Sequence, residues 1–169
     1  MYTAKNILLP LAAVALFIIL VGILTSNLQQ TARHFRIRKL TPDKPKVLVR
    51  DIPVYVDIAK TPREWSLGLS GRESMNMNEG MLFIFDKKER PRFWMKDMLF
   101  PIDIIWIVDG AIIQIEQNVK HPEKDTPLNE LEIYQPFVPV EYVLEVNAGF
   151  VKKYQIAVRD PVDLTEVKK

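Results

Sequence analysis

The chain has 169 residues, of which 48% are hydrophobic and 26% are charged, and its formal net charge is +2. This length and composition fit one ordinary globular domain with a short additional segment. Residues 1–46 carry seven Lys/Arg and one Asp, whereas the remainder carries sixteen Lys/Arg and twenty acidic residues. Such a mildly acidic domain argues against nucleic-acid binding, which needs a basic folded face. The absence of cysteine excludes disulfides, thiol catalysis and cysteine-based zinc sites.

An apolar segment, Ile7–Leu24, has eighteen residues without a charged or strongly polar side chain. As a helix it would be ~27 Å long, close to the thickness of the hydrocarbon core of a bilayer. The segment is longer than the apolar part of a typical signal peptide, and no small-residue cleavage site follows it. We therefore expect a short tail (residues 1–6), an uncleaved single-pass transmembrane anchor (7–24) and a basic juxtamembrane stalk with a proline-containing linker (25–46).

The charges around this anchor do not decide on which side of the membrane the domain lies. Four basic residues follow the anchor and, under the positive-inside rule, place the domain in the cytoplasm: Arg33, Arg36, Arg38 and Lys39. A short N-terminal tail before a long apolar run is equally typical of an export signal-anchor, which places the domain outside. Both orientations stay open at this point.

The domain is expected to begin with two strands and a short helix. Ile52–Ala59 alternates apolar and polar residues as a half-buried strand does, and Val47–Val49 is its expected partner. Thr61 and Glu64 have the spacing of a capping box, which predicts a helix that ends near Gly71.

Strands are expected in four further segments: Met81–Phe85, Arg92–Lys96, Val140–Val146 (with Glu145 facing outward) and Gln155–Val158. A charged turn is expected at Asp86–Pro91, and Asn147 is expected to cap a helical turn. Lys120–Pro139, with four prolines, is expected to be a long surface loop or a lid. The predicted fold class is α+β, a mostly antiparallel and β-rich single domain over residues 47–165, with about six to seven strands and two short helices before a short tail.

The dipeptide Asp109-Gly110 predicts a hairpin between Pro101–Val108 and Ala111–Val119. A type I′ turn needs φ > 0 at both central positions, which this dipeptide favours. If the residues of the two strands pair one to one outward from the turn, the apolar positions share one face. Asp103 then faces Glu116 on the other face, with the two Cβ atoms roughly 5 Å apart. Facing acids are destabilising unless a cation or a shared proton lies between them.

These two acids, with Lys96 as a nearby base, define a predicted polar pocket. Such a pocket can bind a cation or a saccharide, or supply the acid/base pair of a glycosidase. In the structural alternative, Asp103 caps a turn or pairs with Lys96, and Glu116 is solvated. The predicted ligand-binding residues are Lys96, Asp103, Glu116, Trp94 and Arg72, and the alternative catalytic residues are Asp103, Glu116 and Glu145.

Five of the six methionines lie in the stretch from Met75 to Met98. Thioethers are soft ligands for Cu(I), and Met75, Met77 and Met98 are the positions free for such a metal site. Methionine is also ordinary core filler, so packing is the alternative interpretation. The two histidines are not placed with a serine in a nucleophile–base pattern, and no glycine-rich phosphate loop occurs. We expect no cofactor.

Seven short motifs resemble, in order, the uncharacterised family catalogued as domain of unknown function 192: Gly68-Leu69, Arg72, Gly80–Phe83, Phe93–Lys96, Ile102–Ile104, Val143–Glu145 and Gly149. The resemblance covers Val47–Leu164. The chain departs from the family pattern at Ser70, where Met is usual, at Asp97-Met98, where Asn-Thr is usual, and at Ile102, where Leu is usual. The resemblance implies a small, often exported, β-rich domain, and it implies no reaction and no catalytic residues.

These features predict a membrane-anchored protein whose single domain is extracytoplasmic, because the resemblance favours export. The predicted role is non-enzymatic: a binding or accessory module for a small polar ligand, an envelope glycan or a partner protein. The alternatives are a cell-envelope hydrolase that uses paired carboxylates and a methionine-rich Cu(I)-binding protein.

Overall fold

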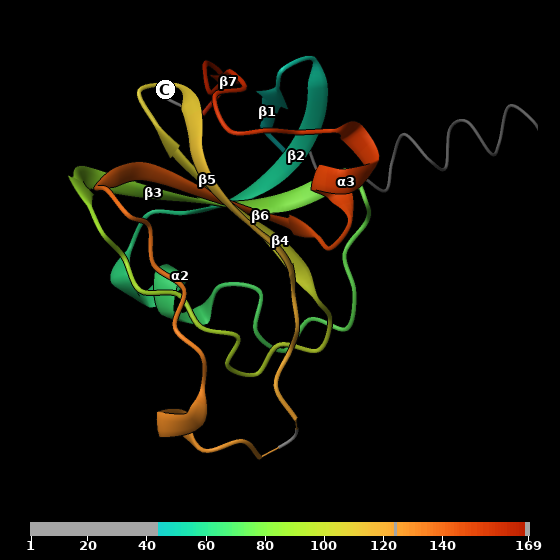
Figure 1. The fold of residues 1–169 in the computed structure, drawn as a ribbon, viewed down its shortest axis with the longest axis vertical. Coiled ribbons are helices and arrows are strands. Elements are labelled where there is room, and N and C mark those ends of the chain that lie inside the picture. The colour runs from blue at the N-terminus through green and yellow to red at the C-terminus, as the bar shows by residue number, and fades with distance from the viewer. Residues whose placement is uncertain (1–43, 124, 168–169) are drawn as a thin grey trace, which may run out of the picture. The chain divides into compact units, whose positions relative to one another are not determined.

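The computed structural model describes residues 44–123 and 125–167. In this part of the chain seven strands form one sheet in the order β5-β4-β6-β3-β2-β1-β7 (Figure 1). The strands are β1 (Lys46–Val49), β2 (Ile52–Ala59), β3 (Glu79–Glu89), β4 (Ile102–Val108), β5 (Ala111–Val119), β6 (Val140–Asn147) and β7 (Val162–Asp163). The pairing of β2 with β3 is parallel, and the other neighbours pair antiparallel.

Two short α-helices and one 3₁₀ turn complete the described part: α2 (Pro62–Leu67), α3 (Phe150–Tyr154) and η1 (Leu128–Glu130). The predicted β-rich α+β fold is therefore confirmed. The predicted anchor, Ile7–Leu24, lies outside the described residues. Among the helices of residues 44–123 and 125–167, none is long and apolar enough to cross a bilayer.

The sheet is covered on both faces, so two hydrophobic cores form. In Figure 1, α3 lies above the sheet, while α2 and the loop that carries η1 lie below it. We call these sides the α3 face and the α2 face. Ile105 and Leu144 belong to the core on the α3 face, and Phe83, Trp106 and Val143 belong to the core on the α2 face. Burial on both faces explains why the central strands carry apolar residues at consecutive positions.

Helix α2 begins as the sequence predicts and ends earlier. The Thr61 hydroxyl accepts a hydrogen bond from the backbone N–H of Glu64, and the Glu64 carboxylate accepts one from the backbone N–H of Thr61. The predicted end at Gly71 is wrong, because Gly68 at φ 50° already ends the helix. A positive φ is readily adopted by glycine, so the first of the two glycines stops the helix.

Two predicted strands are not formed. β3 continues to Glu89 through the predicted charged turn at Asp86–Pro91, and Arg92–Lys96 does not return beside it. The backbone of Phe93 instead exchanges two hydrogen bonds of 2.9 Å with the backbone of Tyr134 in the β5–β6 loop. Gln155–Val158 is likewise not a strand, because Gln155 adopts φ 53° at the end of α3.

The predicted hairpin is present, but its register changes after two pairs. Asp109 and Gly110 both have positive φ, and Ile107 pairs with Ile112 as expected. A β-bulge then places one extra residue in β5, so that Trp106 pairs with Gln114 and Ile104 pairs with Glu116. A bulge of one residue exchanges the faces of the residues that follow it, and the predicted pairing of Asp103 with Glu116 is therefore wrong.

Candidate functional site

A row of side chains crosses the α2 face from β2 to β5. Asp57 pairs with Met81, Met81 with Glu145, Glu145 with Ile104, and Ile104 with Glu116. Cross-strand partners point to the same face of a sheet. Because Met81 and Ile104 belong to the core on the α2 face, the three acids of the row also face that side. Glu145, predicted to face outward, is in fact buried.

Asp103 lies on the opposite face, away from Glu116. Its side chain is 1% exposed. One carboxylate oxygen accepts a hydrogen bond of 2.8 Å from the backbone N–H of Asn118, and the other accepts one of 2.9 Å from the backbone N–H of Val151 at the start of α3. Both oxygens are used inside the fold, so the predicted pocket between Asp103 and Glu116 does not form.

A cavity of about 280 Å³ opens on the α2 face between α2, β3 and the segment that follows β3. This volume is just below the usual range for small-molecule sites, roughly 300–1,000 Å³. Its lining combines six aromatic or thioether side chains with one buried carboxyl, and exposed charges lie among the remaining lining residues. The main lining residues are Trp65, Phe83, Phe85, Phe93, Trp94, Met98, Glu145, Ser66, Glu89 and Arg92.

The aromatic walls are fixed by contacts with one another. Trp65 and Phe85 lie with ring centroids 5.0 Å apart, and Phe93 meets Phe83 edge to face at 4.8 Å. The indole N–H of Trp65 donates a hydrogen bond of 3.1 Å to the carbonyl of Ala59. Such edge-to-face pairs favour one arrangement of the rings, so these walls are largely preformed.

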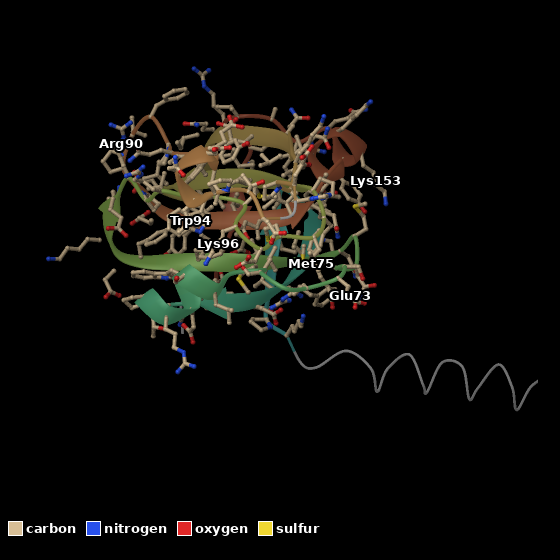
Figure 2. All side chains as sticks on the ribbon, turned by 90° about the horizontal axis from the view of Figure 1, so that it is seen from below. Glu73, Met75, Arg90, Trp94, Lys96 and Lys153 are labelled. Carbon is tan, nitrogen blue, oxygen red and sulfur yellow. The ribbon has the colours of Figure 1, made fainter. Side chains whose placement is uncertain are left out.

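Trp94 differs from the other aromatic residues of the lining, because this large apolar side chain remains 47% exposed. It lines the cavity. In Figure 2, which views the molecule from below, Trp94 and Lys96 lie over the middle of the face, with Met75 and Glu73 toward one end. An exposed indole beside a cavity offers a flat surface on which a ligand can stack.

Glu145 is the buried polar group of the cavity. Its residue is 6% exposed, and no hydrogen bond from the described residues reaches its carboxyl group. Burial raises the pKa of Glu145 to about 8, and the positive charge of Arg72 opposes this rise. A carboxyl that lacks hydrogen bonds to its ionised form retains its proton near neutral pH, so Glu145 is a neutral acid there.

Arg72 does not neutralise Glu145 directly, because its guanidinium donates a hydrogen bond of 2.7 Å to Asp57. Lys44 also contacts the Asp57 carboxylate, at 3.2 Å. Burial works to raise the pKa of Asp57, but the hydrogen bonds from Arg72 and Lys44 outweigh it, so the pKa of this carboxyl is lowered. Asp57 is therefore ionised, and it holds Arg72 at the edge of the row.

The other predicted ligand-binding residues are dispersed. Lys96 lines a neighbouring hollow of about 480 Å³ and forms an ion pair with Asp97 at 3.6 Å. Glu116 accepts a hydrogen bond of 2.8 Å from the side-chain amide of Gln114. Of the predicted ligand-binding set, the cavity described above includes Trp94, and Arg72 acts on Glu145 through its charge.

The predicted metal ligands occupy different environments. Met98 is buried and lines the cavity, Met75 packs partly buried against the core of the α2 face, and Met77 is exposed. Within residues 44–123 and 125–167, no group of three His, Asp or Glu side chains is placed to hold a metal ion. His121 contacts the carbonyl of Pro122 at 3.0 Å and lies apart from the cavity lining.

Comparison with known proteins agrees with the resemblance seen in the motifs. The model of the family DUF192, described as "Uncharacterized ACR", matches residues 46–164, and the chain belongs to this family. No curated protein matches the sequence.

Two solved structures resemble the fold. A protein of unknown function from Novosphingobium aromaticivorans is 25% identical, with a TM-score of 0.63 over 70% of this chain and 83% of that chain. A protein from Sinorhizobium meliloti described as a "putative transcription regulator" is 29% identical, with a TM-score of 0.61 over 73% of this chain and 97% of that chain. The family and the first of these structures carry no assigned function.

Proposed function

We propose that the domain is a binding module for a small ligand, and that the ligand occupies the cavity on the α2 face. The observation that carries the proposal is Glu145, a buried carboxyl that lines the cavity without a hydrogen bond from the described residues. Burial of a carboxyl without a hydrogen bond disfavours its ionised form. Such a group is retained where a ligand supplies the missing partner.

The chemistry of the lining favours a ligand with a compact apolar or ring-shaped body and one polar group. Phe83, Phe85 and Phe93 provide apolar walls, and Trp94 provides an exposed ring face at the cavity. The polar group of the ligand would meet Glu145. A volume of about 280 Å³ suits a small molecule, so we favour such a ligand over an extended glycan or a partner protein.

We further propose that the module is anchored in a membrane and lies outside the cytoplasm. The apolar segment Ile7–Leu24 is long enough to span a bilayer, and the family resemblance favours export. Alkaline phosphatase fused to the C-terminus reports this location, because it is active outside the cytoplasm. This orientation would be contradicted if the phosphatase fusion is inactive and a fusion of green fluorescent protein at the same position is fluorescent.

A cavity-blocking variant tests the binding proposal. The full-length chain in lipid nanodiscs would be examined by saturation-transfer NMR with choline, N-acetylglucosamine and indole as probes. Ser66 of α2 lines the cavity, whereas exposed Arg63 of the same helix does not. We expect Ser66→Trp to abolish the binding of any probe that the unmodified chain binds, and Arg63→Trp to leave it unchanged. No binding of any probe, or equal binding by the two variants, would contradict the proposal.

A further inference from the structure

We propose that the ligand of the cavity carries an organic ammonium group, which lies against the aromatic rings and beside the Glu145 carboxylate. This inference rests on the proposed function, since it names the chemical class of the ligand for the same cavity. It follows from three features of the lining: the aromatic walls, the distribution of charge and the state of Glu145 when the cavity is empty.

The aromatic walls suit a cation. Five aromatic side chains line the cavity, from α2, β3 and the segment that follows β3: Trp65, Phe83, Phe85, Phe93 and Trp94. Ring faces attract alkylammonium groups through the negative potential above each ring, and tryptophan is the strongest of these partners. The methylene or methyl groups of such a cation are also compatible with the apolar wall that Met98 completes.

The charges of the lining favour a cation over an anion. Glu145 is the buried ionisable residue of the lining, whereas Glu89 and Arg92 are exposed. A ligand anion would approach Glu145, and Arg72, whose positive charge acts on Glu145, is already engaged by Asp57 at 2.7 Å. A ligand cation would instead meet the carboxylate directly, and a charge pair beside a buried group is stronger than one in water.

The binding of a cation would be linked to the loss of a proton. Burial keeps Glu145 protonated up to about pH 8. An ammonium group at the carboxyl favours its ionised form, so the ligand replaces the proton. Asp57 on β2 and Glu116 on β5 lie on the same face of the sheet as Glu145. Arg72 in the loop before β3 acts on Glu145 through its charge, and Glu89 and Arg92 line the cavity.

Choline and its neutral isostere 3,3-dimethylbutan-1-ol separate charge from shape, because the two molecules differ in one central atom. Isothermal titration of the full-length chain in nanodiscs at about pH 9 should show choline binding about tenfold or more tighter than the isostere. Choline affinity should then fall by up to about tenfold per pH unit between roughly pH 8 and pH 6. Titrations in buffers of different ionisation enthalpy should show proton release at roughly pH 7.

Glu145→Gln keeps the shape of the side chain and removes its charge. We expect this variant to lose the preference for choline and the pH dependence, while it still binds the isostere. Glu73→Gln, which removes an exposed acid beside Arg72, is the matched control and should behave as the unmodified chain does. Trp94→Leu is a second variant that keeps the apolar surface without the ring face, and it should lower the ratio of choline to isostere affinity.

Two results would overturn the inference, and they differ in what they say of the proposed function. Equal affinities for choline and the isostere, both lost in Ser66→Trp, would show a ligand site without a preference for a cation. Absence of choline binding would also overturn the inference, and the response to N-acetylglucosamine or indole would then decide the proposed function separately.

Discussion

Asp103 on β4 and Val151 in α3 are joined by a hydrogen bond of 2.9 Å, in which the Asp103 carboxylate accepts from the backbone N–H of Val151. The second carboxylate oxygen accepts the backbone N–H of Asn118, a residue held at φ 53° in β5. One buried carboxylate therefore joins β4, the irregular end of β5 and the first turn of α3. This arrangement makes Asp103 a structural residue.

Replacement of Asp103 by Asn should destabilise the domain by about 2–4 kcal/mol, since hydrogen bonds to charged groups are strong and the new amide NH₂ would face a backbone donor. The measurement is the free energy of unfolding of the full-length chain by chemical denaturation. Asp51→Asn, in the exposed β1–β2 turn, is the control and should change this free energy by less than about 0.5 kcal/mol. Equal stability of the two variants would contradict the structural role.

Glu145 should make the stability of the domain fall as the pH rises. Below its usual pKa of 4.5 the carboxyl is protonated in both the folded and the unfolded chain, so it contributes no pH dependence. Between this value and the folded-state pKa of about 8, the unfolded chain loses the proton and the folded chain retains it. Stability therefore decreases through this window, by at most ~1.4 kcal/mol per pH unit.

Glu145→Gln removes this contribution and leaves the other titrating groups in place. The difference in unfolding free energy between the unmodified chain and the variant should fall by about 2–3 kcal/mol from roughly pH 5.5 to pH 7.5. Denaturant titrations at these two pH values measure it. A difference that does not vary with pH would mean that Glu145 is solvated.

Gly80 permits β3 to approach β6 beside Glu145. A Cβ atom at position 80 would lie 2.6 Å from the backbone carbonyl oxygen of Glu145, which is too close for contact. Gly80→Ala should therefore destabilise the domain by about 2–4 kcal/mol, as overpacking of a rigid core does. Gly71→Ala is the control, because no atom lies within 4 Å of its added Cβ and its positive φ of 73° alone opposes the change. Denaturation midpoints compare the two, and an equal loss would argue against the close approach.

Gln114 should hold the β5–β6 loop on the sheet. Its side-chain oxygen accepts the backbone N–H of Phe137 at 2.8 Å, and its nitrogen donates to the carbonyl of Gln135 at 3.3 Å. In Gln114→Ala, amide hydrogen exchange of residues 134–138 should accelerate by about tenfold or more, because local opening becomes easier. Gln117→Ala, at an exposed position of the same strand, should leave this exchange unchanged. Uniform acceleration over the whole sheet would instead indicate global destabilisation.

Local sequence signals predict the elements that begin at a helix cap or are joined by a tight turn. The capping box of Thr61 and Glu64 and the turn at Asp109-Gly110 are both confirmed, because each depends on residues within a few positions. The bulge in β5 has no such signal. It is defined by the pairing of Trp106 with Gln114 across the hairpin, which no pattern of neighbouring residues indicates.

The candidate site was only partly predictable for the same reason. Trp94 and Glu145 are among the residues that the sequence indicates, but their convergence on one cavity requires β6 to be buried on both faces. A glutamate within the apolar run Val143–Val146 is the sequence signal for a buried acid, because a strand in the middle of a covered sheet has no outward face. The aromatic walls, such as Phe83 and Phe93, look like ordinary core residues in the sequence.

The most direct test of this account is the pKa of the Glu145 carboxyl group in the empty cavity. It is measured on the full-length chain by the pH dependence of the side-chain carboxyl ¹³C resonance, assigned by its loss in Glu145→Gln. The account predicts a midpoint of about 8, since burial without a hydrogen bond favours the neutral acid. A midpoint near the usual 4.5 would show that water or another partner satisfies the ionised carboxylate, and the proposed ligand site would lose its basis.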